Sequence, residues 1–254
     1  MSNSHPAHAL RASLGAIQAR IDAACRRVER DPAEVRLLPV SKTVDEARLR
    51  AAYELGIREL GENKVQEAQG KWEAMGDLPD LRWVLIGHLQ SNKARHAARF
   101  ISEFQALHTT RLAETLDRRL QMEGRAIDVL VQVNTSGEDS KFGLPPDEVV
   151  DFVRTLPAYS SLRVRGLMTL ALFSPDESLV RPCFVRLREL RDRLRQEAPD
   201  GVVMDELSMG MSGDFEMAIE EGATTVRVGT AIFGARPTAD SDYWPGFAGK
   251  TTGA

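Results

Sequence analysis

The sequence predicts an α/β protein, a single (β/α)8 TIM-type barrel with an added N-terminal helix. Eight short apolar segments alternate with amphipathic ones along most of the chain. This alternation is typical of parallel βα units, and eight such units close a barrel. An open doubly wound sheet would need a G-x-G-x-x-G turn after the first strand, and the sequence has none there. We see no linker that would divide the chain.

The first half of the chain is expected to supply the N-terminal helix and four strands. Apolar residues recur every three or four positions over residues 7–30, which predicts an amphipathic helix that covers the seam of the barrel. A buried strand is expected at 35–42, followed by a helix that begins at Thr43. Further strands are expected at 58–60, 81–89 and 104–107. The helices that follow them are predicted at 65–75, from Ser91 and from Thr109.

The second half is expected to supply the other four strands, at 127–133, 162–170, 204–208 and 225–228. Helices are predicted after Pro145-Pro146, near 179–197 and from residue 215, the last with Ser212 as its N-terminal cap. Residues 1–8 are expected to be a flexible N-terminus and residues 9–236 the barrel domain. Residues 237–254 are rich in Gly, Thr and Ala and are expected to be a mobile tail.

Composition narrows the class of protein. The chain is 43% hydrophobic and 28% charged, and its net charge of -4 favours neither a nucleic acid nor an anionic membrane as a partner. Cys25 and Cys183 form no CxxC pair, so we expect a reduced, cytoplasmic protein. No apolar run reaches transmembrane length, and no signal-peptide pattern opens the chain. The five histidines show no metal-binding spacing, so we predict no metal site.

Two cations stand out on the expected strands, whose C-terminal ends form the working face of such a barrel. Lys42 follows the apolar run at 37–40. Partial desolvation there favours the neutral, nucleophilic amine, which makes Lys42 a candidate for a Schiff base; a lysine that merely reaches solvent fits equally well. Arg227 lies between two valines of the last strand. It needs an acceptor, which is a carboxylate, a backbone carbonyl or a ligand ring nitrogen.

Two glycine-bearing turns late in the chain indicate an anion site. Gly210 and Gly213 allow a tight turn after the seventh strand, and Gly229 follows the eighth. Exposed backbone N–H groups, with the hydroxyls of Ser212 and Thr230, suit a phosphate, which barrels bind beside their last two strands. Ordinary loops are the alternative.

The roles of two other residues, Lys141 and His88, are not decided by the sequence. Lys141 follows a loop at 135–140 that we expect to be mobile, and we favour surface charge over a role in covering the site. His88 is expected at the mouth of the barrel, where a hydrogen-bonded structural histidine is more common than a catalytic one.

Five segments in order carry a resemblance to a known family: Val40-Ser-Lys-Thr43, Gly61-Glu-Asn-Lys64, Ile86-Gly-His-Leu-Gln-Ser-Asn-Lys93, Ser208-Met-Gly-Met-Ser212 and Val226-Arg-Val-Gly-Thr230. Over about residues 10–236 the chain closely resembles the pyridoxal 5'-phosphate (PLP) homeostasis proteins, relatives of the alanine racemase N-terminal domain. The resemblance implies a barrel of PLP fold-type III, with Lys42 as the Schiff-base lysine. It also implies Asn63 on the ring side of the cofactor, Arg227 facing the pyridine nitrogen, and a phosphate held by Ser208, Ser212, Gly229 and Thr230.

The same resemblance implies a protein that binds PLP, keeps the reactive free aldehyde low and delivers the cofactor to apo-enzymes, without established turnover. The alternative is a PLP-dependent amino-acid racemase. A two-base racemase needs a second acid/base group opposite the lysine, which alanine racemases take from a tyrosine in an added β-domain of the partner subunit. Tyr243 is the one late candidate in this chain. A PLP-free barrel acting on sugar phosphates would leave Lys42 and Asn63 unexplained. We expect a monomer.

Overall fold

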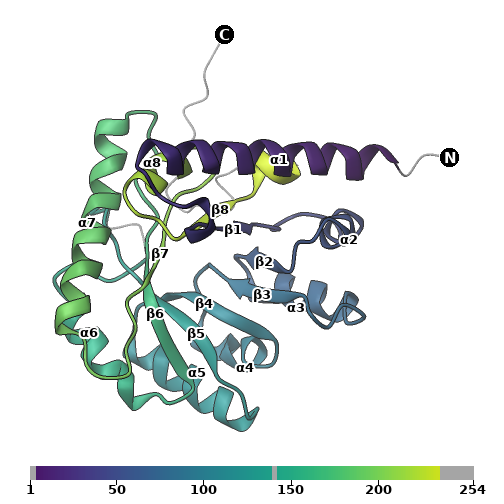
Figure 1. The fold of residues 1–254 in the computed structure, drawn as a ribbon. Helices are drawn as coiled ribbons and strands as arrows, with labels where there is room; N and C mark the ends of the chain where they lie inside the picture. The colour runs from purple at the N-terminus through teal and green to yellow at the C-terminus, as the bar shows by residue number, and fades with distance from the viewer. Residues whose placement is uncertain (1–3, 139–141, 235–254) are drawn as a thin grey trace.

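The computed structural model describes residues 4–138 and 142–234, and within these ranges eight parallel strands form one sheet. Their order is β1-β8-β7-β6-β5-β4-β3-β2, so the first strand lies beside the last (Figure 1). The strands are β1 (Arg36–Pro39), β2 (Glu59–Glu62), β3 (Arg82–Leu85), β4 (Ile101–Leu107), β5 (Ile127–Gln132), β6 (Leu162–Met168), β7 (Glu206–Ser208) and β8 (Thr225–Val228).

The two strands at the ends of this order, β1 and β2, also meet and close the barrel. Val40 and Gly61 form an isolated parallel bridge, and the Ser41 N–H donates to the Gly61 carbonyl at 2.9 Å. On its other side β1 pairs with β8, with Leu38 opposite Arg227. The predicted (β/α)8 TIM-type barrel is therefore confirmed.

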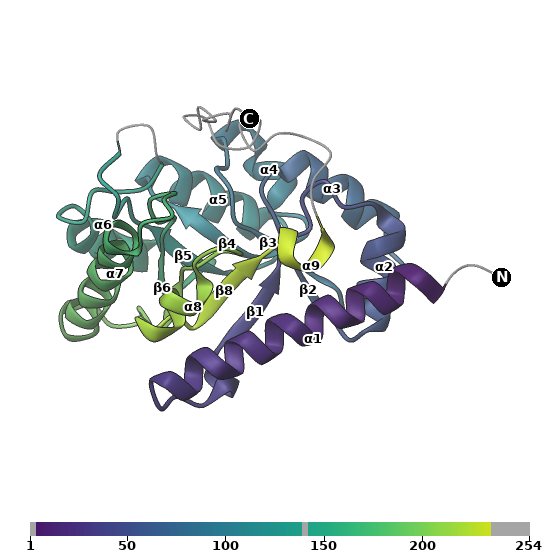
Figure 2. The ribbon, with the colours of Figure 1, turned by 90° about the horizontal axis from the view of Figure 1, so that it is seen from above.

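Helices cover the outside of the barrel (Figure 2). Helix α5 is typical: it buries an apolar stripe that includes Leu112, Leu116 and Leu120, and Thr109 caps it by accepting from the Leu112 N–H. The helices are α1 (Ser4–Arg27), α2 (Glu46–Glu54), α3 (Val65–Ala74), α4 (Ala94–Ala97), α5 (Thr110–Met122), α6 (Val149–Thr155), α7 (Glu177–Glu197), α8 (Phe215–Glu220) and α9 (Thr230–Phe233), with 3-10 turns η1 (Pro32–Glu34), η2 (Ser91–Lys93) and η3 (Leu156–Ala158).

The long helix α1 runs along the outside of the barrel against α2, α8 and α9, where the first and last strands pair (Figure 2). Ile21 on its inner face is fully buried. Arg20 and Arg27 form ion pairs with Glu216 and Glu220 of α8, each with an Nε–Oε1 distance of 2.7 Å. Because these arginines are largely exposed, the pairs contribute little, and burial of the apolar face holds the helix over the seam.

Several boundaries differ from the predicted ones. Helix α1 begins at Ser4, three residues before the start expected from the sequence, and the flexibility expected of residues 1–8 stays a prediction. The helix predicted from Thr43 begins at Glu46, with Asp45 as its cap, because Thr43 has a φ of +65° that a helix does not contain. The strands predicted at 35–42, 81–89 and 162–170 end earlier, and turns follow them at the mouth of the barrel. The predicted tail at 237–254 lies outside the described residues.

In the described part of the chain no helix combines the length and the apolar character that a membrane span requires.

Candidate functional site

The C-terminal ends of β1, β7 and β8 bring the predicted site residues to one end of the barrel. Lys42 follows β1 and is buried, with 4% of its surface exposed, and Arg227 on the adjacent strand β8 is buried to the same degree, at 3%. Ser208 ends β7 and is fully buried. Parallel pairing in register explains the arrangement, because it aligns the C-terminal ends of neighbouring strands at one rim.

The backbone on both sides of Lys42 is held from α3 and β2 by a group of four side chains, Ser41, Glu62, Glu67 and Lys71, that we call the lysine clamp. The Ser41 hydroxyl donates to Glu62 Oε1 at 2.5 Å, and Lys71 Nζ donates to the Ser41 carbonyl at 2.7 Å. On the other side of Lys42, the Thr43 N–H donates to Glu67 Oε1 at 2.6 Å. These bonds fix the turn that carries Lys42, including the left-handed conformation of Thr43.

Glu62 is the buried centre of the lysine clamp. Burial raises its pKa to about 7, although the Lys71 ammonium, at 2.6 Å from Oε1, acts in the opposite direction. Its second oxygen, Oε2, is buried and has no hydrogen-bond partner among the described residues. Sequence analysis gave no role to Glu62, although this residue stands in one of the five segments that carry the resemblance. It also missed Lys71, for which the available signal was the spacing of four residues from Glu67 on a helix.

Asn63 follows β2 at the same rim and is partly buried. Its backbone packs against Gly87 after β3, where a Cβ would lie 2.3 Å from the Asn63 carbonyl oxygen. Only a glycine at position 87 therefore lets the two strand ends approach this closely.

The two glycine-bearing turns meet. The Thr230 hydroxyl donates to Ser212 Oγ at 3.2 Å, which joins the turn after β8 to the turn after β7. Gly210 has a φ of +93°, and a Cβ there would lie 2.6 Å from the Ala218 side chain, so both the turn and its packing require glycine. The prediction that Ser212 caps α8 was wrong: Asp214 occupies the cap position, and its Oδ1 accepts from the Met211 N–H at 2.6 Å.

Gly229 is buried at the start of α9, and its carbonyl accepts from the Ile232 and Phe233 N–H groups, at 2.9 Å each. Thr230 beside it is exposed. The turn after β8 therefore presents the Thr230 hydroxyl at the surface while Gly229 anchors α9 behind it.

Arg227 is held by neutral acceptors. Its Nη1 donates to Ser208 Oγ at 2.6 Å and its Nη2 to the Thr169 carbonyl at 2.7 Å. Within the described part of the chain the guanidinium forms no ion pair. Burial lowers the pKa of Arg227 to about 10, while the charge of Asp214 acts in the opposite direction. Of the acceptors considered from the sequence, a backbone carbonyl is confirmed, and the Ser208 hydroxyl is one that the sequence did not reveal.

Ser208 forms hydrogen bonds in a different part of the barrel from the other residues that are predicted to hold the phosphate. Its hydroxyl bonds to Gln105 and Arg227 inside the barrel, whereas Ser212 and Thr230 bond to each other at the rim. Its predicted contact with a phosphate stays a prediction. Gln105 and Thr169 were missed by sequence reasoning, because an amide and a threonine on apolar strands carry no motif.

Two histidines meet one aromatic ring at the ends of β3 and β4. His88 stacks on Phe142 with a centroid distance of 4.2 Å, and His108 lies 5.9 Å from the same ring. Burial, followed by the charge of His108, lowers the pKa of His88. Lys141 lies outside the described residues, and in the described ranges no cluster of residues suits a metal ion.

Known proteins are similar to this chain in sequence and in fold. The family model for the alanine racemase N-terminal domain matches residues 12–237. Two relatives called pyridoxal phosphate homeostasis protein are each 41% identical. The protein from Aquifex aeolicus aligns over 223 residues, with 88% of this chain and 96% of the relative covered. The protein from Pseudomonas aeruginosa aligns over 224 residues, with 88% and 94% covered.

Solved structures agree. PipY of Synechococcus elongatus, solved without PLP and with PLP bound, is 38% identical and superimposes with TM-scores of 0.77 and 0.75, covering 86% of this chain and all of PipY. An alanine racemase from Clostridium difficile superimposes with a TM-score of 0.70 at 14% identity, covering 91% of this chain and 58% of the racemase. At that identity the likeness is one of fold alone.

Proposed function

The chain belongs to the alanine racemase N-terminal domain family, with the pyridoxal phosphate homeostasis proteins as its relatives, and on this premise we propose that it binds PLP and serves PLP homeostasis. Lys42 holds the cofactor as a Schiff base, and the protein keeps free PLP low and delivers it to apo-enzymes. The observation that carries the proposal is a buried lysine at the end of β1 on the same rim as a buried arginine and two joined phosphate-type turns on β7 and β8.

The donor set at the rim fits PLP. The cofactor supplies an aldehyde, a pyridine nitrogen and a phosphate. An amine suits the aldehyde, and a guanidinium held only by neutral acceptors suits the lone pair of the ring nitrogen. Hydroxyl groups and backbone N–H groups suit a phosphate. The lysine clamp adds the support that a nucleophile needs, because it fixes the backbone on both sides of Lys42.

In this proposal each predicted residue has one task. Lys42 bonds to the aldehyde carbon, Asn63 lies on the ring side, and Arg227 donates to the pyridine nitrogen. Ser212, Gly229 and Thr230 hold the phosphate, and Ser208 lies beneath Arg227.

A racemase is the second candidate, and the comparisons favour homeostasis over it. The chain is 41% identical to homeostasis proteins that it covers almost completely, but 14% identical to an alanine racemase of which it covers 58%. A guanidinium beside the ring nitrogen disfavours the protonated pyridine that makes PLP a strong electron sink, but Arg227 does not decide the choice by itself, because the racemases that the chain resembles use an arginine there too. We also propose that the protein is cytoplasmic and monomeric. Light scattering after size-exclusion chromatography tests the oligomeric state.

Borohydride reduction of the protein loaded with PLP tests the central assignment. Peptide mass mapping should place the pyridoxyl group on Lys42, and an adduct mainly on Lys93 or Lys141 would contradict the proposal. Incubation with L- or D-alanine in deuterated water separates the two candidate functions. Little exchange at Cα is expected of a carrier, whereas fast exchange with racemic product would favour the racemase.

A further inference from the structure

Inside the barrel a line of polar side chains connects Arg227 with the opposite rim, where the strands begin. We call it the polar column, and its members in order are Arg36, Glu103, Gln105, Ser208 and Arg227. Glu103, Gln105 and Ser208 are almost fully buried, at 3%, 0% and 0% exposure. Side chains two apart on a strand face the same side, so Glu103 and Gln105 of β4 stand one above the other within the barrel.

Each hydrogen bond of the polar column has a fixed donor. A carboxylate only accepts hydrogen bonds and a guanidinium only donates them, so Glu103 must be an acceptor and Arg227 must be a donor. Gln105 therefore presents its NH2 group to Glu103, with Nε2 2.5 Å from Oε1, and its oxygen to Ser208, with Oε1 2.6 Å from Oγ. The single hydrogen of the Ser208 hydroxyl is thus committed to Gln105, and its lone pairs receive Arg227 Nη1 at 2.6 Å.

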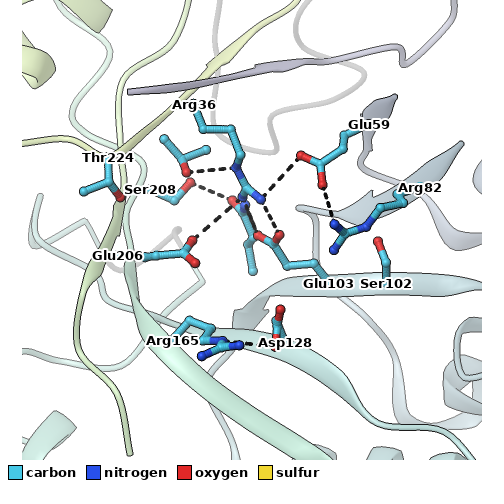
Figure 3. Close-up of polar contacts among 12 residues, drawn as sticks. Arg36, Glu59, Arg82, Ser102, Glu103, Asp128, Arg165, Glu206, Ser208 and Thr224 are labelled. Atoms are coloured by element: carbon cyan, nitrogen blue, oxygen red, sulfur yellow. Dashed lines mark hydrogen bonds and ion pairs between the residues drawn. The ribbon is translucent and has the colours of Figure 1, made fainter. Parts of the chain in front are cut away.

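The lower end of the polar column is anchored by charge. Arg36 donates from Nη1 and Nη2 to the two oxygens of Glu103, at 2.8 Å each, and Figure 3 shows Glu59 and Glu206 on either side of it. Arg82 pairs in turn with Glu59, at 3.2 Å. Glu103 is therefore immobilised from below, and every donor above it, from Gln105 to Arg227, points down toward it.

We propose that Glu103, Gln105 and Ser208 are positioning residues of the PLP site, which hold the Arg227 guanidinium in one orientation from within the barrel. This inference rests on the proposed function in so far as it concerns PLP. It assigns Ser208 to the support of Arg227 in place of the phosphate contact predicted from the sequence, because the hydroxyl has no second hydrogen to donate. Residues on β4, across the barrel from Lys42, thereby influence how the site receives a ring nitrogen.

Arginine side-chain NMR of the PLP-free protein tests the orientation directly. A guanidinium bonded through both Nη atoms rotates slowly about its Nε–Cζ bond and gives separate Nη signals, which average when the bonds are lost. The variants are Gln105→Met and Ser208→Ala, and Arg227→Lys assigns the signals. Each variant should merge the Arg227 signals and weaken PLP retention about tenfold, as expected for one buried hydrogen bond. The double variant should have no larger effect than either single one.

Ser102→Ala is the matched control, because Ser102 lies on the same strand and its hydroxyl donates to the Trp83 carbonyl at 3.2 Å, outside the polar column. It should leave both readouts unchanged. Separate Arg227 signals in Gln105→Met would overturn the inference. If Gln105→Met fails to fold, Ser208→Ala takes its place, because it removes only one oxygen atom. Separate Arg227 signals in Ser208→Ala would then overturn the inference.

Phosphorus NMR separates the two roles of Ser208. A changed signal of bound PLP in Ser208→Ala, with the Arg227 signals intact, would return Ser208 to the phosphate and overturn the polar column. A wild-type protein that retains no PLP would refute the proposed function instead, and the Arg227 signals of the PLP-free variants would still decide the inference.

Discussion

Arg36 and Arg227 lie on adjacent strands inside one barrel, yet their surroundings are opposite. Near the start of the strands Arg36 has three carboxylates around it, with nitrogen–oxygen distances of 2.8 Å to Glu103, 3.5 Å to Glu59 and 3.9 Å to Glu206. Burial acts to lower its pKa, but the hydrogen bonds and charge of Glu103 raise that pKa above the ordinary value. Among the residues that the structure describes, Arg227 has a hydroxyl and a carbonyl as its direct acceptors, and burial lowers its pKa.

The difference separates a structural cation from one that receives a ligand in the proposed function. The charge of Arg36 is balanced within the protein, so it stabilises the fold and offers nothing to a small molecule. Among the described residues the charge of Arg227 is desolvated without a bonded carboxylate, a cost that an incoming acceptor would offset. In the proposed function, identical side chains therefore contribute to stability at one rim and to recognition at the other.

The largest expected effect comes from Arg36→Met. This substitution leaves Glu103 buried without its bidentate partner, and removing one member of a buried pair costs about 3–5 kcal/mol. The free energy of unfolding of the PLP-free protein, from urea titration at pH 7, should fall by about that amount. A loss below about 1 kcal/mol would show that Arg82 balances these carboxylates unaided.

Glu62, at the upper rim, should make the stability of the protein depend on pH. The pKa of Glu62 is raised from 4.5 to about 7, so the folded state keeps a proton that the unfolded chain has already lost. The contribution of Glu62 to stability is therefore full below pH 4.5 and is lost as the pH rises to about 7. Glu62→Gln removes this dependence.

The free energy of unfolding of Glu62→Gln, relative to wild type, should therefore rise across that window by up to about 3 kcal/mol, since one pKa unit corresponds to about 1.4 kcal/mol. Urea titrations at several pH values between 4 and 8 measure it. Glu67→Gln, in the same lysine clamp but more exposed, is the matched control. A pH-independent difference for Glu62→Gln would contradict the assignment.

The rim turns should affect binding and leave stability almost unchanged. Thr230→Ala or Ser212→Ala removes one hydroxyl donor, and the loss of about 1–3 kcal/mol weakens PLP binding roughly ten- to a hundred-fold. Equilibrium dialysis measures this, with pyridoxal as the control ligand that lacks the phosphate. Equal weakening of pyridoxal binding would place these hydroxyls elsewhere than at the phosphate.

The smallest change in stability is expected from Arg227→Met, the same substitution as at Arg36. It removes a desolvated charge and leaves two neutral acceptors, so the free energy of unfolding should change by no more than about 1 kcal/mol. PLP affinity should fall about tenfold. If Arg227→Met destabilises the protein as much as Arg36→Met, the contrast between the two rims is wrong.

Most strands and helices of the fold could be predicted from local sequence patterns. Strand β8 was predicted to the residue, because alternating apolar residues between Gly222 and Gly229 leave one interpretation. The start of helix α2 was predicted at Thr43 instead of Glu46. The sequence did not reveal the left-handed turn at Thr43, because that turn arises from the lysine clamp, whose residues lie far apart in the sequence.

The candidate site divides in the same way. Lys42, Arg227 and the two turns stand at strand ends, where fold class alone indicates function, and the structure brings them to one rim. Gln105 and Glu103 were not predicted, because their hydrogen bonds cross the interior of the barrel to β7 and β1, and no motif encodes such contacts. The bond from Ser208 to Gln105 spans 103 residues of sequence.

The pairing of β1 with β8 under helix α1 has a consequence for synthesis on the ribosome. Lys42 is made early, but the strand that carries Arg227 and the turn that carries Thr230 are among the last parts of the barrel to be translated. Contacts of such long sequence separation form late, and the closing of the ring waits for them. A nascent chain that ends before β8 therefore contains Lys42 but lacks Arg227 and the turn that carries Thr230. In the proposed function, it gains its complete set of cofactor-binding residues only after β8 has been released.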